Sequence, residues 1–270
     1  MKFKMSVLVF SIIVSLTFTG CSDYQKVLKS NDYTKKYEVA LKLYNKKDYQ
    51  KAYPLLEELV SVKRGTKEAE DIYYYYCYCN YYLDDLISAS YHFSQFAKTY
   101  PASDRAEETS YMNAYCFYLG SPQYSLDQSN SYKAIQEMQM FINQYPNSSR
   151  IAECNELIDK LRVKLEVKSY EGGMLYFKMT DYKAAIVALN NTLKDYPMTA
   201  YREEILYTII EANFLLAENS YDNKKAERYK ASMDAYYTFI DKFADGKYAK
   251  DAKVMFEKAQ QRYTTYSSMN

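Results

Sequence analysis

The 270-residue sequence contains no tryptophan, only one histidine, six glycines and five prolines. A single histidine, His92, cannot assemble a zinc site with its supporting partners, and it leaves no Ser/His/Asp order for nucleophilic catalysis. No glycine-rich loop that could cradle a phosphate is present. With so few glycines and prolines and 26% charged residues, the chain is expected to be helical with few long loops. The sequence therefore predicts a helical protein that is not an enzyme and holds no metal or cofactor.

The charges are balanced. When residues 1–20 are set aside, 33 basic side chains stand against 34 acidic ones. No basic excess is available to attract nucleic acid or acidic lipids, so neither is expected as a partner. Tyrosine is abundant, with 34 copies, and its ring can fill a packed core while its hydroxyl keeps a polar contact.

The N-terminus reads MKFKMSVLVFSIIVSLTFTGC, with two lysines followed by an apolar run of 12 residues that ends at Phe18. This run is shorter than the roughly 20 residues needed to span a bilayer, so residues 1–20 are predicted to be a signal peptide. The motif that ends at Cys21 is similar to the lipobox of bacterial lipoproteins, which implies a lipid on the cysteine sulfur and cleavage before it. That family usually has leucine where this chain has Phe18. The alternative is an ordinary signal peptide that leaves Cys21 as a free thiol.

Three segments end alike: FAKTYPASDRAEE, FINQYPNSSRIAE and LKDYPMTAYREE. Proline disfavours a helical conformation in the residue before it, so each Tyr-Pro should end a helix. The Ser or Thr that follows, with acidic residues after it, predicts the N-cap of the next helix. Acidic runs such as Glu57-Glu58, Glu107-Glu108 and Glu203-Glu204 are expected to be solvated.

Small residues lie 12 positions before each of these prolines, at Ala89, Ala134 and Ala185. A small side chain early in a helix lets the partner helix approach closely, and Ala52 and Ser232 begin matching segments. Their spacing is near or above the roughly 34 residues of a tetratricopeptide repeat. The pattern predicts an all-α, right-handed solenoid of about five tetratricopeptide-like helix pairs plus a C-terminal helix.

We expect the helices in pairs, and a last helix alone. The expected ranges are 33–45 with 49–62, 66–83 with 86–100, 104–119 with 131–145, 150–178 with 182–196, 201–219 with 224–243, and then 248–264. The predicted domains are a signal peptide over 1–20, a lipidated linker over 21–32, repeats one to three over 33–149, and repeats four and five with the final helix over 150–264.

The stretch DIYYYYCYCNYYL at residues 71–83 falls in the first helix of the second pair. Cys77 and Cys79 are two residues apart and point in different directions on a helix, so they cannot share a metal or form a good disulfide. Cys79 aligns with Cys116 in the third pair and with Ala212 in the fifth, which indicates a small-residue packing position. We expect these cysteines and Cys154 to be buried free thiols.

Tyr75, Tyr78 and Tyr82 share one face of that helix. The first helix of each stacked pair lines the concave side of such a solenoid, where rigid tyrosines could grip an extended peptide or a partner loop. These three tyrosines are the predicted binding residues. The alternative is that they simply form core.

The segment from YPNSSRIAECNELIDKL to DYPMTAYREEILYTIIEANFLLA, in repeats that follow a lipobox, resembles the BamD family of outer-membrane β-barrel assembly lipoproteins. The resemblance covers roughly residues 21–220, and residues 221–270 are longer than the family's usual ending. It implies a non-catalytic scaffold, lipid-anchored at the periplasmic face of the outer membrane. It also implies binding to the periplasmic domains of the barrel-assembly protein BamA and to unfolded outer-membrane proteins.

A different repeat-containing envelope lipoprotein is the alternative, such as a partner in glycan uptake or cell-envelope maintenance. The residues that follow Cys21 do not decide between the periplasmic and the cell-surface leaflet.

Overall fold

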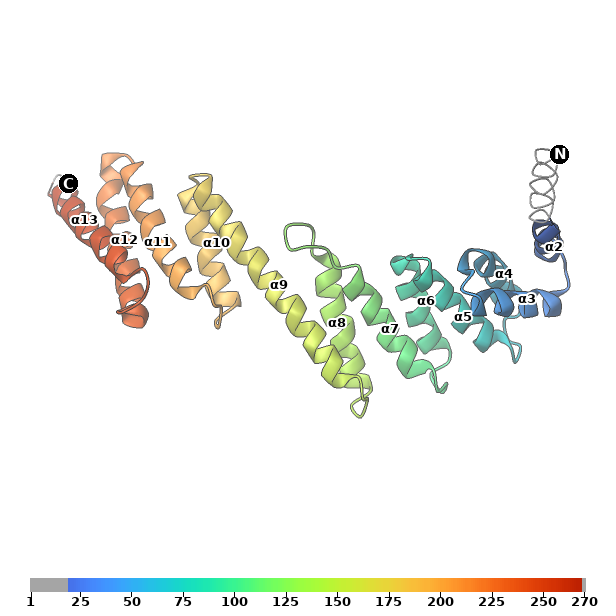
Figure 1. The fold of residues 1–270 in the computed structure, drawn as a ribbon. Helices are drawn as coiled ribbons and strands as arrows, with labels where there is room; N and C mark the ends of the chain where they lie inside the picture. The colour runs from blue at the N-terminus through green and yellow to red at the C-terminus, as the bar shows by residue number, and fades with distance from the viewer. Residues whose placement is uncertain (1–18, 269–270) are drawn as a thin grey trace, which may run out of the picture. The chain divides into compact units, whose positions relative to one another are not determined.

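The computed structural model describes residues 19–268, with side chains from Asp23 onward. The predicted signal peptide therefore lies outside the described residues, apart from its last two positions. The described chain forms two compact units (Figure 1). Unit 1 runs to Pro122 and includes Gln128–Ile158, whereas unit 2 consists of Gln123–Asp127 and the chain from Asp159 onward. The domain boundaries predicted from the sequence stay a prediction.

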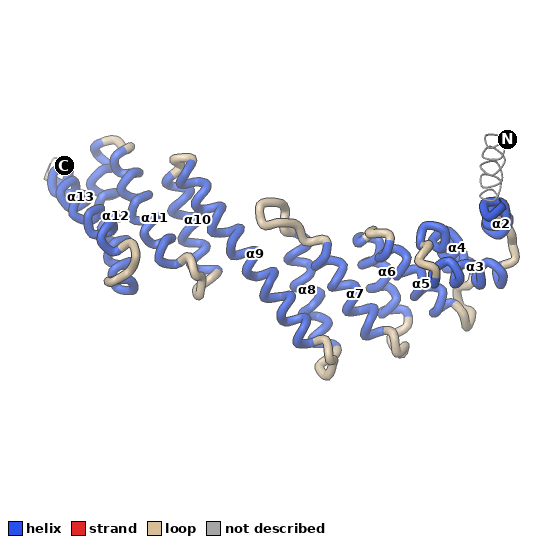
Figure 2. The backbone as a smooth tube through the Cα atoms, viewed as in Figure 1, coloured by secondary structure: helices blue, strands red, loops and turns tan. Residues whose placement is uncertain are grey.

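Every regular element in residues 19–268 is a helix (Figure 2). The all-α fold of five helix pairs and a final helix is confirmed, and most helix ends lie within three residues of the predicted ones. One helix was not predicted, because the expected linker over 21–32 is largely helical. The helices are α2 (Thr19–Leu28), α3 (Tyr33–Asn45), α4 (Tyr49–Val62), α5 (Ala69–Tyr82), α6 (Leu86–Thr99), α7 (Ala106–Leu119), α8 (Ser129–Gln144), α9 (Ile151–Lys178), α10 (Tyr182–Asp195), α11 (Arg202–Glu218), α12 (Asp222–Phe243) and α13 (Ala249–Ser267).

In three of the five pairs an aspartate caps the second helix, and in each pair a small residue lets the two helices close. The Asp48, Asp85 and Asp181 side chains each accept a hydrogen bond from a backbone N–H three residues on, as N-caps do. The small residues predicted to sit at the helix contacts are all fully buried, and so are the apolar residues one turn after the four alanines, whereas Tyr236, one turn after Ser232, is half-buried. The small residues are Ala52, Ala89, Ala134, Ala185 and Ser232.

Neighbouring pairs are joined by a stacking contact that recurs in both units. The residue just before a first helix lies against a tyrosine in the first helix of the preceding pair. In unit 1 the Arg105 guanidinium lies 4.3 Å from the Tyr74 ring centroid. In unit 2 the rings of Tyr201 and Tyr170 stack with centroids 4.1 Å apart. The full set is Tyr74 with Arg105, Tyr111 with Arg150, Tyr170 with Tyr201, and Tyr207 with Tyr248. We term Tyr74, Tyr111, Tyr170 and Tyr207 the inter-repeat tyrosines.

A glutamate four residues before an inter-repeat tyrosine binds the loop that leads to the next first helix. Glu70 accepts a hydrogen bond from Ser103 Oγ at 2.6 Å, and Glu107 accepts one from Ser148 Oγ at 2.6 Å. Two predictions were therefore wrong. The serines lie three residues before the first residue of α7 and of α9, and Ser103 Oγ accepts a hydrogen bond from the backbone N–H of the N-cap residue, Arg105. The glutamates are tied to them and are not simply solvated.

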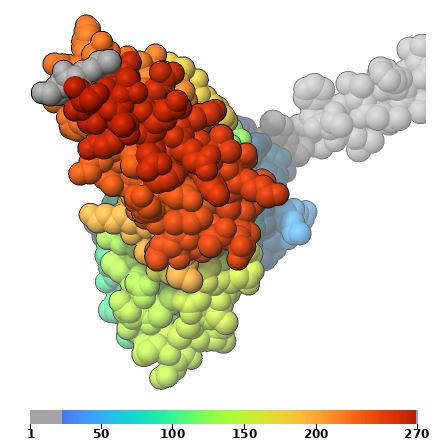
Figure 3. Space-filling model, turned by 90° about the vertical axis from the view of Figure 1, so that its left-hand side faces the viewer, coloured from blue at the N-terminus to red at the C-terminus, as the bar shows by residue number. Residues whose placement is uncertain are grey.

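The loop between α12 and α13 makes the same connection with a glycine in place of the serine. A Cβ on Gly246 would lie 2.3 Å from Glu203 Oε1, so the carboxylate occupies the space that a side chain would need. Glu203 accepts the backbone N–H of Tyr248 directly, at 3.0 Å. Helix α13 thus follows the same kind of loop as α7 and α9, and together with α12 it covers the C-terminal face of unit 2 (Figure 3).

Two adjacent glycines in α9 provide a test of the packing in unit 2. A Cβ on Gly173 would lie 2.5 Å from Leu189 Cδ2 in α10, whereas a Cβ on Gly172 would meet nothing within 4 Å. We expect Gly172→Ala to raise the free energy of unfolding by about 0.5–1 kcal/mol through helix propensity. Gly173→Ala should lower it by about 1–2 kcal/mol, because overpacking against Leu189 outweighs that gain.

Urea unfolding of the full chain, followed by circular dichroism, measures both variants. Each is the control for the other, since both make the same chemical change one residue apart. Equal stabilisation by the two alanines would contradict the close approach of α9 and α10.

Candidate functional site

The tyrosine-rich stretch at 71–83 lies almost wholly in α5, and α5 contacts helices on both sides. It packs against α3 and α4 of the preceding pair and against its own partner α6. Cys77, Cys79 and Asn80 are buried. The stretch is therefore a central helix of unit 1, and most of its aromatic surface is covered.

The three tyrosines predicted to bind a partner differ in exposure. Tyr78 is 8% exposed, Tyr75 is half-buried, and Tyr82 at the end of α5 is 48% exposed. The structure brings them together. The Tyr44 ring of α3 lies 4.8 Å from that of Tyr75 and 6.3 Å from that of Tyr82, and the rings of Tyr78 and Tyr82 are 5.8 Å apart. Their role in binding stays a prediction, and Tyr82 is the one that offers the largest accessible surface.

Tyr82 forms part of a stack with Tyr49, the first residue of α4. Their ring centroids are 4.4 Å apart and their planes are inclined by 15°. Tyr44 meets the edge of Tyr49 at 5.4 Å, which closes the group on the α3 side. We term Tyr44, Tyr49, Tyr75, Tyr78 and Tyr82 the tyrosine cluster. Because its rings hold one another in place, it offers a preorganised aromatic surface that would lose little conformational entropy on binding.

Glu108 at the start of α7 fixes the buried side of this cluster. Tyr78 Oη donates to Glu108 Oε1 at 2.6 Å, and Tyr74 Oη donates to Glu108 Oε2 at 2.9 Å. Burial, with a further contribution from Glu108, raises the pKa of Tyr74 to about 12. The same two causes raise the pKa of Tyr78. Both phenols therefore stay protonated donors, and their hydroxyls are engaged within the fold.

The cysteines predicted to be buried free thiols are confirmed. Cys77, Cys79, Cys116 and Cys154 are all free and buried. Burial raises the pKa of Cys79 and of Cys116 to about 12, so neither supplies a thiolate near neutral pH. These four residues act as small apolar groups at helix contacts.

His92 is half-buried beside Tyr73 and Tyr76. Tyr73 Oη lies 3.2 Å from His92 Nδ1, and burial lowers the pKa of the imidazole. Among residues 19–268, no group of three or more His, Cys, Asp or Glu side chains is arranged to hold a metal ion. In the same range, no helix combines the length and the apolar character that crossing a bilayer requires.

Cys21 lies in α2, and its side chain belongs to the part of the chain that is not described. Its lipidation stays a prediction.

Sequence reasoning missed the arginines and carboxylates that connect the repeats. Arg105 and Arg150 each follow the tyrosine of a Tyr-Pro pair by five residues, and both lie over an inter-repeat tyrosine. This shared position was the signal that could have revealed them. Glu108 carried a weaker signal, because its pairing with two tyrosines of another helix depends on the packing of the repeats.

Comparison with known proteins identifies relatives. A family model described as outer membrane lipoprotein (YfiO) matches residues 29–229. The outer membrane protein assembly factor BamD of Rickettsia prowazekii (strain Madrid E) is 22% identical over 233 residues, which cover 84% of this chain and 89% of the relative.

Two solved structures of tetratricopeptide domains also align with the chain. The domain of P58(IPK) aligns with 89% of this chain and 68% of its own, at 14% identity and a TM-score of 0.41. The TPR2AB domain of yeast Sti1, in its pHSP90 complex, aligns with 84% of this chain and 98% of its own, at 12% identity and a TM-score of 0.38. The fold assignment comes from the helix pairs described above and not from these alignments.

The bond between Glu108 and Tyr78 can be tested by a double-mutant cycle. Glu108→Ala leaves the Tyr78 hydroxyl inside the fold without its acceptor, which should lower the free energy of unfolding by about 1–3 kcal/mol. In a Tyr78→Phe background, the loss of unfolding free energy caused by Glu108→Ala should be smaller by at least about 1 kcal/mol, because no hydroxyl at position 78 is left without an acceptor.

Thermal unfolding of the four chains gives the coupling energy. Tyr74→Phe combined with Glu108→Ala serves as the parallel cycle for the longer of the two bonds. Strictly additive losses in both cycles would rule out Glu108 as the acceptor that fixes this cluster.

Proposed function

Because the chain belongs to the YfiO family of outer membrane lipoproteins, we propose that it is a non-catalytic, lipid-anchored scaffold for the assembly of outer-membrane β-barrel proteins. In this proposal a lipid on Cys21 anchors it to the outer membrane, with the repeats on the periplasmic face. Its partners are the periplasmic domains of the barrel-assembly protein BamA and unfolded outer-membrane proteins.

The observation that carries the proposal is the family match over residues 29–229, on a chain whose described part consists of helix pairs. The relative in Rickettsia prowazekii is named as an outer membrane protein assembly factor. A signal peptide that ends at a lipobox-like cysteine is consistent with a lipoprotein. Acyl chains at Cys21 would hold the repeats at the membrane surface and raise their effective concentration near other membrane components.

The tyrosine cluster supports binding of an extended segment. The segments that become barrel strands in outer-membrane proteins have aromatic and aliphatic side chains that alternate with polar ones, and the unfolded chain exposes these segments. Tyr82 and Tyr49 present stacked rings at the surface of unit 1, and their packing leaves them few conformations to lose. Aromatic side chains of this kind are frequent energetic hot spots in recognition surfaces.

The lipid anchor can be tested in cells with a fatty-acid analogue. We expect the native chain to be labelled and the Cys21→Ala chain to be unlabelled, because the other four cysteines are all buried. Cys154→Ala is the matched control, since it removes a buried thiol and should leave the label intact. Label that persists on the Cys21→Ala chain would place the lipid elsewhere.

The proposed partners can be tested by photocrosslinking in cells. A photoreactive phenylalanine analogue at Tyr82 should crosslink to unfolded outer-membrane proteins, identified by mass spectrometry. The same analogue at Tyr221, which is 88% exposed in unit 2, is the control for random collisions. Co-purification of the native chain should recover the barrel-assembly protein. Recovery of a glycan importer, with no outer-membrane barrel protein crosslinked at Tyr82, would overturn the proposal.

A further inference from the structure

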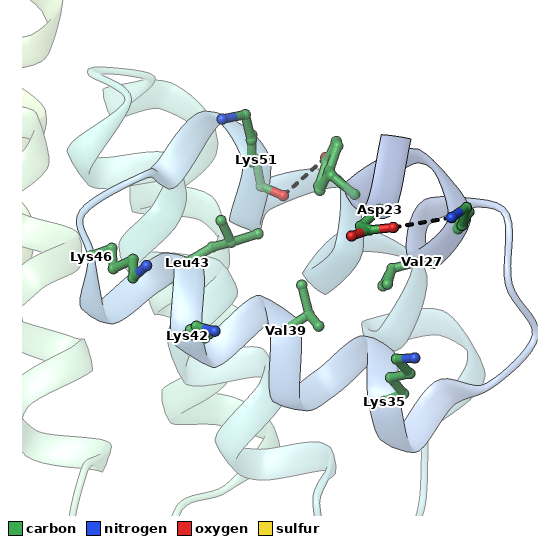
Figure 4. Close-up of a pocket in the computed structure, with 10 residues that line it drawn as sticks. Asp23, Val27, Lys35, Val39, Lys42, Leu43, Lys46 and Lys51 are labelled. Carbon is green, nitrogen blue, oxygen red and sulfur yellow. Dashed lines mark hydrogen bonds and ion pairs between the residues drawn. The ribbon is translucent and has the colours of Figure 1, made fainter. Parts of the chain in front are cut away.

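A pocket lined by lysines lies between α2, α3 and α4 of unit 1, at the end of the chain nearest Cys21 (Figure 4). Its volume is about 870 Å³. Val27, Val39 and Leu43 form its apolar part, and five lysines stand around them. These are Lys26, Lys35, Lys42, Lys46 and Lys51.

Three of the five lysines form a row along α3. Lys35, Lys42 and Lys46 are exposed and are spaced by seven and four residues, which places them on one face of the helix (Figure 4). Val39 and Leu43 lie at intervening positions of the same face and point into the pocket (Figure 4). Within residues 23–268, none of these three ammonium groups has a carboxylate partner, unlike Lys26, which pairs with Asp23.

The wall opposite α3 is held by specific contacts. Tyr24 Oη of α2 donates to the Lys51 carbonyl of α4 at 3.1 Å. The buried Lys36 ammonium donates to the Leu28 carbonyl at 3.1 Å and to Glu58 at 2.5 Å. Here too an acidic residue predicted to be solvated is bound within the fold. The three helices are therefore fixed around the pocket.

The local charge differs from the average of the chain. Residues 23–51 carry eight lysines and four carboxylates, whereas residues 52–270 carry 25 basic and 30 acidic side chains. The balanced total predicts no acidic lipid as a partner, whereas this segment alone carries a basic excess. Clusters of lysines on an amphipathic helix beside a membrane attract anionic lipids.

We propose that this pocket binds the phosphate-bearing headgroup of an anionic membrane phospholipid. The ammonium groups of Lys35, Lys42 and Lys46 supply the positive charge that attracts the phosphate, and their methylene stems together with Val39 and Leu43 contact the glycerol and the first methylenes of the acyl chains. A free phosphate ion would leave that apolar part unused. Cys21 lies only two residues before Asp23 at the pocket rim. A chain anchored there would therefore be oriented at the membrane as well as tethered to it.

Lysine reactivity tests the proposal on the full chain in nonionic detergent micelles. The rate of modification by an amine reagent is measured at each lysine by mass spectrometry. Phosphatidylglycerol in the micelles should slow modification of Lys35, Lys42 and Lys46 at least about threefold. Phosphatidylcholine, or soluble glycerol phosphate at the same concentration, should not. Lys183 and Lys250, which are exposed in unit 2, are the reference positions and should be unaffected.

Variants make the test independent of reactivity. Native mass spectrometry counts the phosphatidylglycerol molecules retained by each chain. Lys35→Gln/Lys42→Gln/Lys46→Gln should reduce retention at least about tenfold. Lys183→Gln/Lys230→Gln/Lys250→Gln makes the same change of charge in unit 2 and should retain the lipid.

Several results would overturn the proposal: equal loss in both triple variants, equal protection by phosphatidylcholine, equal protection by soluble glycerol phosphate, or no protection at all. The pocket does not require acylation, so the Cys21→Ala chain should show the same protection. A failure of the lipid anchor is therefore distinguishable from a failure of the headgroup site.

Discussion

The contact on which the helix pairs depend is the one between an inter-repeat tyrosine and the flat side chain that precedes the next first helix. Arg105 and Tyr201 meet their tyrosines at similar distances, 4.3 and 4.1 Å, although one contact is a cation over a ring and the other a stack of two rings. The position needs a planar group and not a particular charge. This contact precedes α7, α9, α11 and α13, and the small residues inside each pair let the second helix close.

This requirement explains the dependence on tyrosine. Each inter-repeat tyrosine must supply a large ring for stacking, and Tyr74 also donates its hydroxyl to a carboxylate of the next pair. Phenylalanine at position 74 would supply the ring alone, and Glu108 would then lose one of its two tyrosine donors. In α5, the hydroxyls of Tyr74 and Tyr78 are engaged with Glu108, whereas Tyr82 at the end of the helix remains accessible. Of these three, Tyr82 offers the most surface to a partner.

The helix pairs were predictable because their signals are local. Tyr-Pro follows the end of α6, α8 and α10, although Tyr53-Pro54 lies inside α4, and Ala89 or Ala185 marks a close contact by size alone. The candidate site was less predictable. Tyr75, Tyr78 and Tyr82 share a helix face, yet their burial differs because α3, α4 and α7 cover different lengths of α5. The lysine pocket could not be predicted from the total charge, because a sum over the whole chain does not show where the charges lie. Lys35, Lys42 and Lys46 act together through their shared helix face.

The same contact between an inter-repeat tyrosine and the residue before a first helix recurs at the C-terminal end, which is longer than the usual ending of the family. The family match stops at residue 229, inside α12. Beyond it, Tyr248 stacks on Tyr207 with ring centroids 4.9 Å apart, and Glu203 binds the loop before α13. These are the contacts that introduce a first helix elsewhere in the chain. Since α13 packs on α11 and α12 as well, residues 230–268 continue the repeat pattern, and α13 closes the last pair by covering apolar surface that would otherwise face water.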